Sequence, residues 1–74
     1  MNANPILLQK KYTRVIALLS EKANISLDEG LKFFYHSFVY QLMKDGVSDM
    51  HCMSDEYLAE DLLREYRNWD DSAN

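Results

Sequence analysis

The sequence predicts an all-α protein, a small bundle of three to four helices in a single domain that spans residues 1–74. Apolar residues recur at spacings of three and four along three segments, which is typical of helices with one buried face. Helix-start residues precede these segments, and residues that favour a left-handed backbone follow the first two. The predicted helices span about residues 5–23, 27–36, 37–45 and 55–68, and residues 70–74 form a frayed polar tail.

The first helix has a clear start and a clear end. Asn4 can cap it, and Pro5 suits the first helical position, where its missing N–H would be unpaired in any case. Asn24 tolerates a positive φ, so we expect it to end the helix in the left-handed conformation. The predicted buried stripe consists of Leu8, Tyr12, Val15, Ile16, Leu19 and Ala23.

The region from residue 24 to residue 46 contains strong helix signals. Ser26 and Glu29 have the spacing of a capping box, in which each side chain accepts a hydrogen bond from the backbone N–H of the other residue. Gly30 costs about 1 kcal/mol in a helix relative to Ala, so its presence suggests that another helix crosses closely there. One apolar stripe contains Leu27, Leu31, Phe34, Phe38 and Leu42, and a neighbouring stripe contains Tyr35, Val39 and Met43.

This pattern fits either one continuous helix or two helices that nearly join at His36–Ser37. Ser37 can cap a second short helix, and we favour two helices for that reason. The two apolar stripes predict that this region is central in the bundle. Gly46 is expected to end it in the left-handed conformation, with Val47 in contact with Leu42 as in a Schellman motif.

The last helix begins with a cap at Ser54. The connection before it, residues 47–53, is fairly apolar, and we expect it to lie against the core. Glu60 and Arg64 have the spacing of a favourable i,i+4 ion pair. The predicted buried stripe contains Leu58, Leu62, Tyr66 and Trp69, flanked by Ala59 and Leu63.

Length and cysteine content exclude several classes of protein. A domain of 74 residues buries a small core and is only marginally stable without a partner. The single cysteine, Cys52, excludes an internal disulfide and a four-cysteine zinc site, and it suits a reducing compartment, so we expect a cytoplasmic protein. We expect no signal peptide, because Pro5–Leu8 leads directly into Gln9–Lys11, and no membrane span, because no apolar run is long enough.

Charge is distributed unevenly along the chain, whose net charge is −4. Residues 1–46 contain six Lys or Arg and four Asp or Glu, whereas residues 47–74 contain two Arg and eight Asp or Glu. This asymmetry indicates either an acidic helix packed beside a basic one, which is the more frequent arrangement, or an acidic face for a basic partner. The acidity argues against nucleic-acid binding, and a helix-turn-helix over Ser26–Met43 would offer few side chains to base edges.

Candidate catalytic and metal-binding residues are few. His51 and Cys52 are the only adjacent pair of reactive side chains, and no third residue is evident that would orient a nucleophile, so we expect a small buried Cys52 and a boundary His51. Together with His36 and Asp49 they lack the spacing of a metal site. We therefore predict a protein that is not an enzyme and has no catalytic residue, cofactor or metal.

Several short motifs lie between Ile25 and Tyr66. They are Ile25–Glu29 (Ile-Ser-Leu-Asp-Glu), Phe33–Ser37 (Phe-Phe-Tyr-His-Ser), Tyr40–Leu42 (Tyr-Gln-Leu) and Ser54–Leu58, which fits the pattern Ser-x-Glu-Tyr-Leu. In these motifs the chain resembles a small bacterial family of all-helical proteins of unknown function. Genes of that family often neighbour predicted ADP-ribosyltransferase-like toxins, so the resemblance implies an accessory or antitoxin-like role. It implies no catalytic residues.

The predicted function is protein–protein interaction, and the alternative is a small DNA-binding transcriptional regulator. The acidic last helix and a surplus of aromatic residues favour the first, with carboxylates meeting a basic surface of a partner such as a toxin encoded nearby. Self-association is a further option for so small a domain. The candidate partner-binding residues are Asp55, Glu56, Tyr57, Glu60, Asp61, Glu65 and Trp69.

Overall fold

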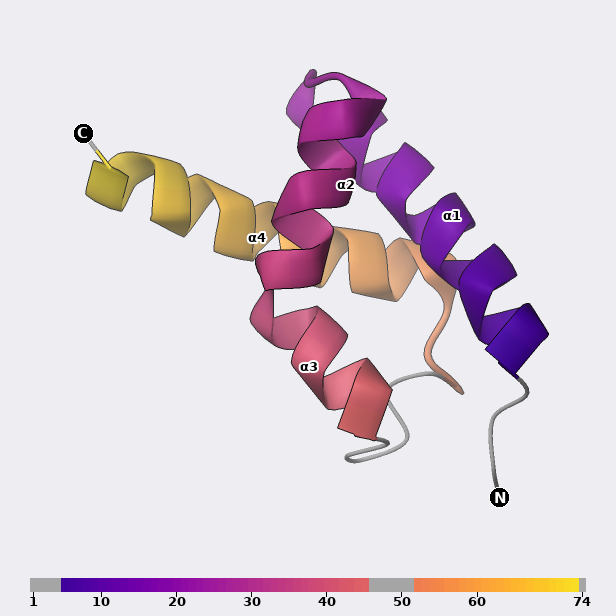
Figure 1. Ribbon diagram of the computed structural model, residues 1–74. Helices are drawn as coiled ribbons and strands as arrows, with labels where there is room; N and C mark the ends of the chain where they lie inside the picture. Colours follow the sequence, from indigo (N-terminus) through magenta and orange to yellow (C-terminus); the bar gives the residue numbers. More distant parts are fainter. Residues whose placement is uncertain (1–4, 46–51, 74) are drawn as a thin grey trace.

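The described part of the chain folds into α-helices without strands, which confirms the predicted all-α bundle. The computed structural model describes residues 5–45 and 52–73. The helices are α1 (Pro5–Ala23), α2 (Leu27–His36), α3 (Phe38–Asp45) and α4 (Asp55–Ala73). In Figure 1, α1 and α2 lie side by side in opposite directions, α3 follows α2 at an angle, and α4 crosses behind α2.

The fourth helix is longer than the sequence pattern predicted. It continues to Ala73, whereas we predicted an end near residue 68 and a frayed tail over residues 70–74. Adding a residue to an existing helix costs little, and residues 69–73 contain neither Gly nor Pro to stop it. As a result, the second half of α4 projects well beyond α2 in Figure 1.

The connection between α1 and α2 has the predicted geometry. Asn24 adopts the left-handed conformation with φ of 58°, and the N–H of Ile25 donates to the carbonyl oxygen of Ser20 at 3.0 Å. Ser26 then caps α2, because its Oγ accepts a hydrogen bond from the Glu29 N–H at 3.1 Å. These local bonds reverse the chain so that α2 packs back along α1.

Ser37 separates α2 from α3, so the prediction of two helices is confirmed. Its backbone is extended, with φ of −80° and ψ of 157°. The buried Ser37 hydroxyl donates to the Phe34 carbonyl oxygen at 2.6 Å and accepts from the Tyr40 N–H at 3.1 Å. One side chain thus ends the first helix and caps the second.

The break at Ser37 changes which apolar residues are buried. On the predicted stripes, Leu27, Leu31, Tyr35 and Phe38 are 64%, 42%, 37% and 65% exposed. In a continuous helix Phe38 would follow Phe34 on the same face, but the extended Ser37 between them separates the two, so that Phe34 is buried and Phe38 is exposed. The helix α2 therefore turns Phe34 into the core, and α3 turns Val39 and Met43 inward.

The core forms where the helices meet around Tyr12. The centroid of the Tyr12 ring lies 5.2 Å from that of Phe34 and 5.7 Å from that of Tyr40. Burial raises the pKa of Tyr12 above its usual 10.0, with smaller effects from Tyr40 and Tyr35, so its hydroxyl stays protonated at neutral pH. The buried cluster contains Tyr12, Val15, Ile16, Leu19, Phe34, Val39, Met43, Leu58, Leu62 and Leu63, and Leu8 and Ala23 pack against it.

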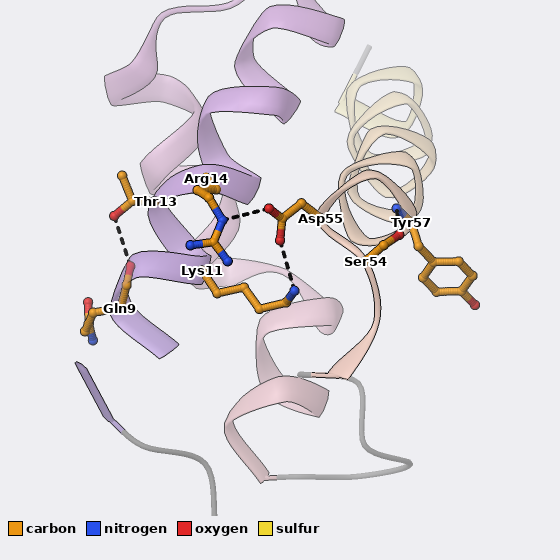
Figure 2. A network of polar contacts seen from close by, with 7 residues as sticks. All are labelled: Gln9, Lys11, Thr13, Arg14, Ser54, Asp55 and Tyr57. Carbon is orange, nitrogen blue, oxygen red and sulfur yellow. Dashed lines mark hydrogen bonds and ion pairs between the residues drawn. The ribbon is translucent and has the colours of Figure 1, made fainter. Parts of the chain in front are cut away.

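The connection into α4 is described only from residue 52. Gly46, Val47 and His51, whose roles we predicted, lie outside the described residues. Cys52 is exposed, so the expectation of a buried cysteine is wrong, and the half-buried Met53 packs against the core in its place. Ser54 caps α4 as predicted, with its Oγ accepting from the N–H of Tyr57 at 3.0 Å (Figure 2).

Gly30 lies where α1 and α2 come closest together. A Cβ atom added to Gly30 would collide with the Oγ of Ser20 and lie 3.5 Å from Cγ2 of Ile16. The Ser20 hydroxyl is buried and donates to the Ile16 carbonyl oxygen at 2.8 Å. The close helix crossing that Gly30 predicted is therefore confirmed.

We predict that the effect of Gly30→Ala depends on the residue at position 20. In the native protein the substitution should lower the free energy of unfolding by about 1 kcal/mol, because the new methyl group displaces the Ser20 hydroxyl. In a Ser20→Ala background the collision is absent, and Ala should stabilise α2 by up to about 1 kcal/mol through helix propensity. Urea denaturation of the four proteins measures this coupling. An equal effect in both backgrounds would contradict it.

We also predict that Ser37→Ala lowers the free energy of unfolding by about 1–2 kcal/mol. The substitution removes the hydroxyl that caps α3 and leaves the Tyr40 N–H without this acceptor. Thr13→Ala is the matched control, since the exposed Thr13 hydroxyl donates to the Gln9 carbonyl oxygen at 3.0 Å and caps no helix. The control should change stability by less than about 0.5 kcal/mol. Equal losses in the two variants would show that the Ser37 cap is unimportant.

Candidate functional site

The first predicted partner-binding residue, Asp55, holds α4 against α1. Its Oδ1 lies 2.9 Å from the Lys11 Nζ and its Oδ2 lies 2.7 Å from the Arg14 Nε (Figure 2). The hydrogen bond from Arg14, then that from Lys11, lowers the pKa of Asp55 below its usual 3.8. The carboxylate at the start of α4 therefore serves a contact within the molecule.

Glu56 and Glu60 also face α1. Their carboxylates lie 3.1 Å and 3.6 Å from the Lys22 Nζ, and the hydrogen bond that Lys22 donates to Glu56 raises the pKa of Lys22. The predicted pair of Glu60 with Arg64 is replaced by a pair of Arg64 with Asp61, three residues earlier on α4. Glu60 points across to α1 because Lys22 lies on that side, which sequence spacing alone does not show.

Glu65 caps α3 from a distant part of the chain. Its Oε2 accepts a hydrogen bond from the Phe38 N–H at 2.7 Å, across 27 residues of sequence. The first N–H groups of a helix have no partner within the helix, and its N-terminus favours negative charge. Glu65 therefore ties the second half of α4 to the start of α3.

The five candidate carboxylates thus each have a partner within the chain. Three of them pair with α1, so an acidic helix does pack beside a basic one, which is the first of the two arrangements that the charge asymmetry indicated. Of the two candidate aromatics, Tyr57 is 49% exposed, and Figure 2 shows its ring pointing away from α1. Trp69 lies about 18 Å further along α4, so these two rings belong to different surfaces.

An open groove between α2 and α4 is the most distinctive surface in the described part of the chain. Phe33 from α2 packs edge-on against Tyr66 from α4 at a centroid distance of 5.1 Å. The ring of Trp69 lies 5.9 Å from that of Phe33 and 6.0 Å from that of Tyr66. The groove has a volume of about 490 Å³ and is lined by Glu29, Lys32, Phe33, His36, Glu65, Tyr66 and Trp69.

The groove is open because α4 extends beyond the helices that pack against it. Tyr66 and Trp69 continue the stripe that begins with the buried Leu58 and Leu62. Toward its C-terminus, α4 passes behind α2 and projects from the bundle (Figure 1). Tyr66 is consequently half-buried and Trp69 is 57% exposed, so the prediction that both lie in the buried stripe is wrong for Trp69.

Two of the predicted site residues, Glu65 and Trp69, lie in this groove. The α2 side of the groove, which includes Glu29, Phe33 and His36, was missed as a functional surface. Its residues recur at spacings of three and four on one face of α2, which is the only signal of them in the sequence. This spacing points to a groove only once the structure shows that α4 lies beside this face of α2.

The groove has the chemistry of a binding surface. Its lining combines three aromatic rings with a few charged groups, as in many recognition sites. Within residues 5–45 and 52–73 there is no cluster of three or more His, Cys, Asp or Glu side chains suited to a metal ion. None of the helices described here combines the length and the apolar character needed to cross a membrane.

Comparison with models of known protein families, with curated proteins and with solved structures gives no match to this chain.

The pKa of Asp55 predicts how the contact between α1 and α4 responds to acid. Because this pKa is lower in the folded protein than its usual 3.8, the ion pairs stabilise the fold above that pH and are lost as the pH falls through the lower value. Native protein should be about 0.5–1 kcal/mol more stable than Asp55→Asn near neutral pH. Urea denaturation of both proteins across the acid range should show this difference shrinking below pH 3.8. A constant difference would contradict the prediction.

Proposed function

We propose that this protein acts by binding another protein through the groove between α2 and α4, and that it catalyses no reaction. The observation that supports this most is the exposed Trp69, held beside Tyr66 and Phe33 in an open groove. Large rigid rings bury much area at low entropic cost, and tryptophan and tyrosine are enriched among the residues that dominate binding energy. A small domain that exposes such rings to solvent has a surface suited to binding a partner protein.

This proposal shifts the binding surface away from the acidic face expected from sequence. Asp55 forms ion pairs with Lys11 and Arg14 of α1, and Glu56 and Glu60 both pair with Lys22 of the same helix. A partner that used those carboxylates would have to break these ion pairs first. Trp69 needs no such rearrangement, because more than half of its surface already faces solvent.

The partner that we propose is an enzyme encoded nearby, as the resemblance to toxin-associated proteins implies. The protein would then be an accessory or antitoxin-like component that occludes or scaffolds this enzyme. We place it in the cytoplasm, since its only cysteine, Cys52, is exposed and suits a reducing compartment.

A role in DNA binding receives less support. A protein that binds DNA needs cations that are available to phosphates. On α1, the helix with the most basic residues, Lys11, Arg14 and Lys22 are paired with carboxylates of α4. Binding to phosphates would therefore compete with the contact that joins the two helices.

The decisive experiment mixes the purified protein with the product of the adjacent gene and measures their affinity by calorimetry. Trp69→Ala should weaken the complex about 30-fold, as expected for an anchor residue of about 2 kcal/mol. Tyr57→Ala is the matched control, an exposed ring on the same helix outside the groove, and it should change the affinity less than about threefold.

Circular dichroism should show that both variants keep the helical content of the native protein. Failure of the native protein to form a complex at low salt would count against the proposal. So would an equal loss of affinity in the Tyr57 and Trp69 variants, because it would place the interface elsewhere.

A further inference from the structure

The rings of the groove are spaced so that one group can touch several of them. The centroids of Phe33, Tyr66 and Trp69 lie 5.1–6.0 Å apart, and their planes meet at 37°, 53° and 90°. A cation is attracted to the face of an aromatic ring within about 6 Å of its centroid. The three rings are thus close enough together for a single cationic group in this groove to contact more than one of them.

The charges around these rings favour a cation. Glu29 and Glu65 both line the groove. The Glu29 side chain makes no ion pair with any residue that the structure describes, and Glu65 uses Oε2 for the Phe38 N–H, which leaves Oε1 available as an acceptor. The Lys32 side chain is the opposing charge, and Asp28 balances it at 3.1 Å.

We propose that the group that enters this groove is an arginine side chain of the partner protein, an inference that rests on the proposed function. The planar guanidinium stacks on aromatic rings, is weakly hydrated, and carries several N–H donors that match carboxylates. Its three-carbon stem can lie along the apolar wall of the groove while the charged end reaches Glu29 or Glu65.

Other side chains fit the groove less well. A leucine would cover the rings of Tyr66 and Trp69 but would remove water from Glu29 and Glu65 without replacing it, which is unfavourable for a carboxylate. A lysine ammonium would satisfy the carboxylates, but it is more strongly hydrated and cannot stack on a ring. Arginine is the side chain that meets both requirements.

Trp69 makes this inference directly testable, because it is the only tryptophan in the chain and its fluorescence reports on the groove. The purified full-length protein is titrated with N-acetyl-arginine amide, N-acetyl-lysine amide, N-acetyl-leucine amide and N-acetyl-citrulline amide. Citrulline has the shape of arginine without its charge. The arginine amide should give a saturable change and bind about tenfold more tightly than the citrulline amide, with the lysine amide in between.

Three variants locate the binding site. Glu29→Gln should weaken arginine amide binding about three- to fivefold, and glutamine also suits this position near the start of α2. Glu21→Gln is the control, because Glu21 is an exposed carboxylate on α1 outside the groove, and it should have no effect. Lys32→Gln should strengthen binding, because it removes a positive charge from the lining of the groove.

Equal binding of the arginine and citrulline amides, tighter binding of the leucine amide, or no saturable change with any probe would overturn the arginine assignment. None of these results alters the complex assay with Trp69→Ala, which tests the proposed function by itself. If the arginine preference is found but the protein forms no complex with the adjacent gene product, the assignment of that partner fails and the chemistry of the groove stands.

Discussion

The turn at Ser37 determines how the later part of the chain is arranged. Because Ser37 ends α2, the N–H of Phe38 becomes the first unpaired donor of α3, and Glu65 of α4 accepts from it at 2.7 Å. That bond holds the second half of α4 beside the end of α2. Tyr66 follows Glu65 directly and meets Phe33, so the aromatic groove depends on the same break that separates the two helices.

The charges of the chain join its two halves through ion pairs. The acidic half of the sequence is held against the basic half by Asp55 with Lys11 and Arg14, and by Lys22 with Glu56. Each pair is partly exposed and stabilises the fold only modestly, but together they fix the crossing of α1 and α4. Because these carboxylates already form ion pairs, the groove is distinguished from the rest of α4 by its aromatic rings more than by its charge.

Local features of the fold were more predictable from sequence than long-range ones, of which the close crossing at Gly30 and the packing of an acidic helix beside a basic one were anticipated. The caps at Ser26, Ser37 and Ser54 and the left-handed Asn24 depend on bonds between residues close in the chain. The contact of Glu65 with Phe38 spans 27 residues and leaves no local pattern. Trp69 shows a related limit, because periodicity gives the direction of a side chain on its helix but not whether another element covers it.

If a cationic group binds in the groove as proposed, Glu65 would take part in both binding and folding. A carboxylate on a surface helix normally loses conformational freedom when it contacts a partner, and that loss opposes association. The bond to the Phe38 N–H already restricts Glu65 in the free protein. The rings of Phe33, Tyr66 and Trp69 likewise constrain one another through edge-on and tilted contacts. A cationic group would thus meet a site ordered in advance, with Glu29 as the one acidic lining residue left to adjust.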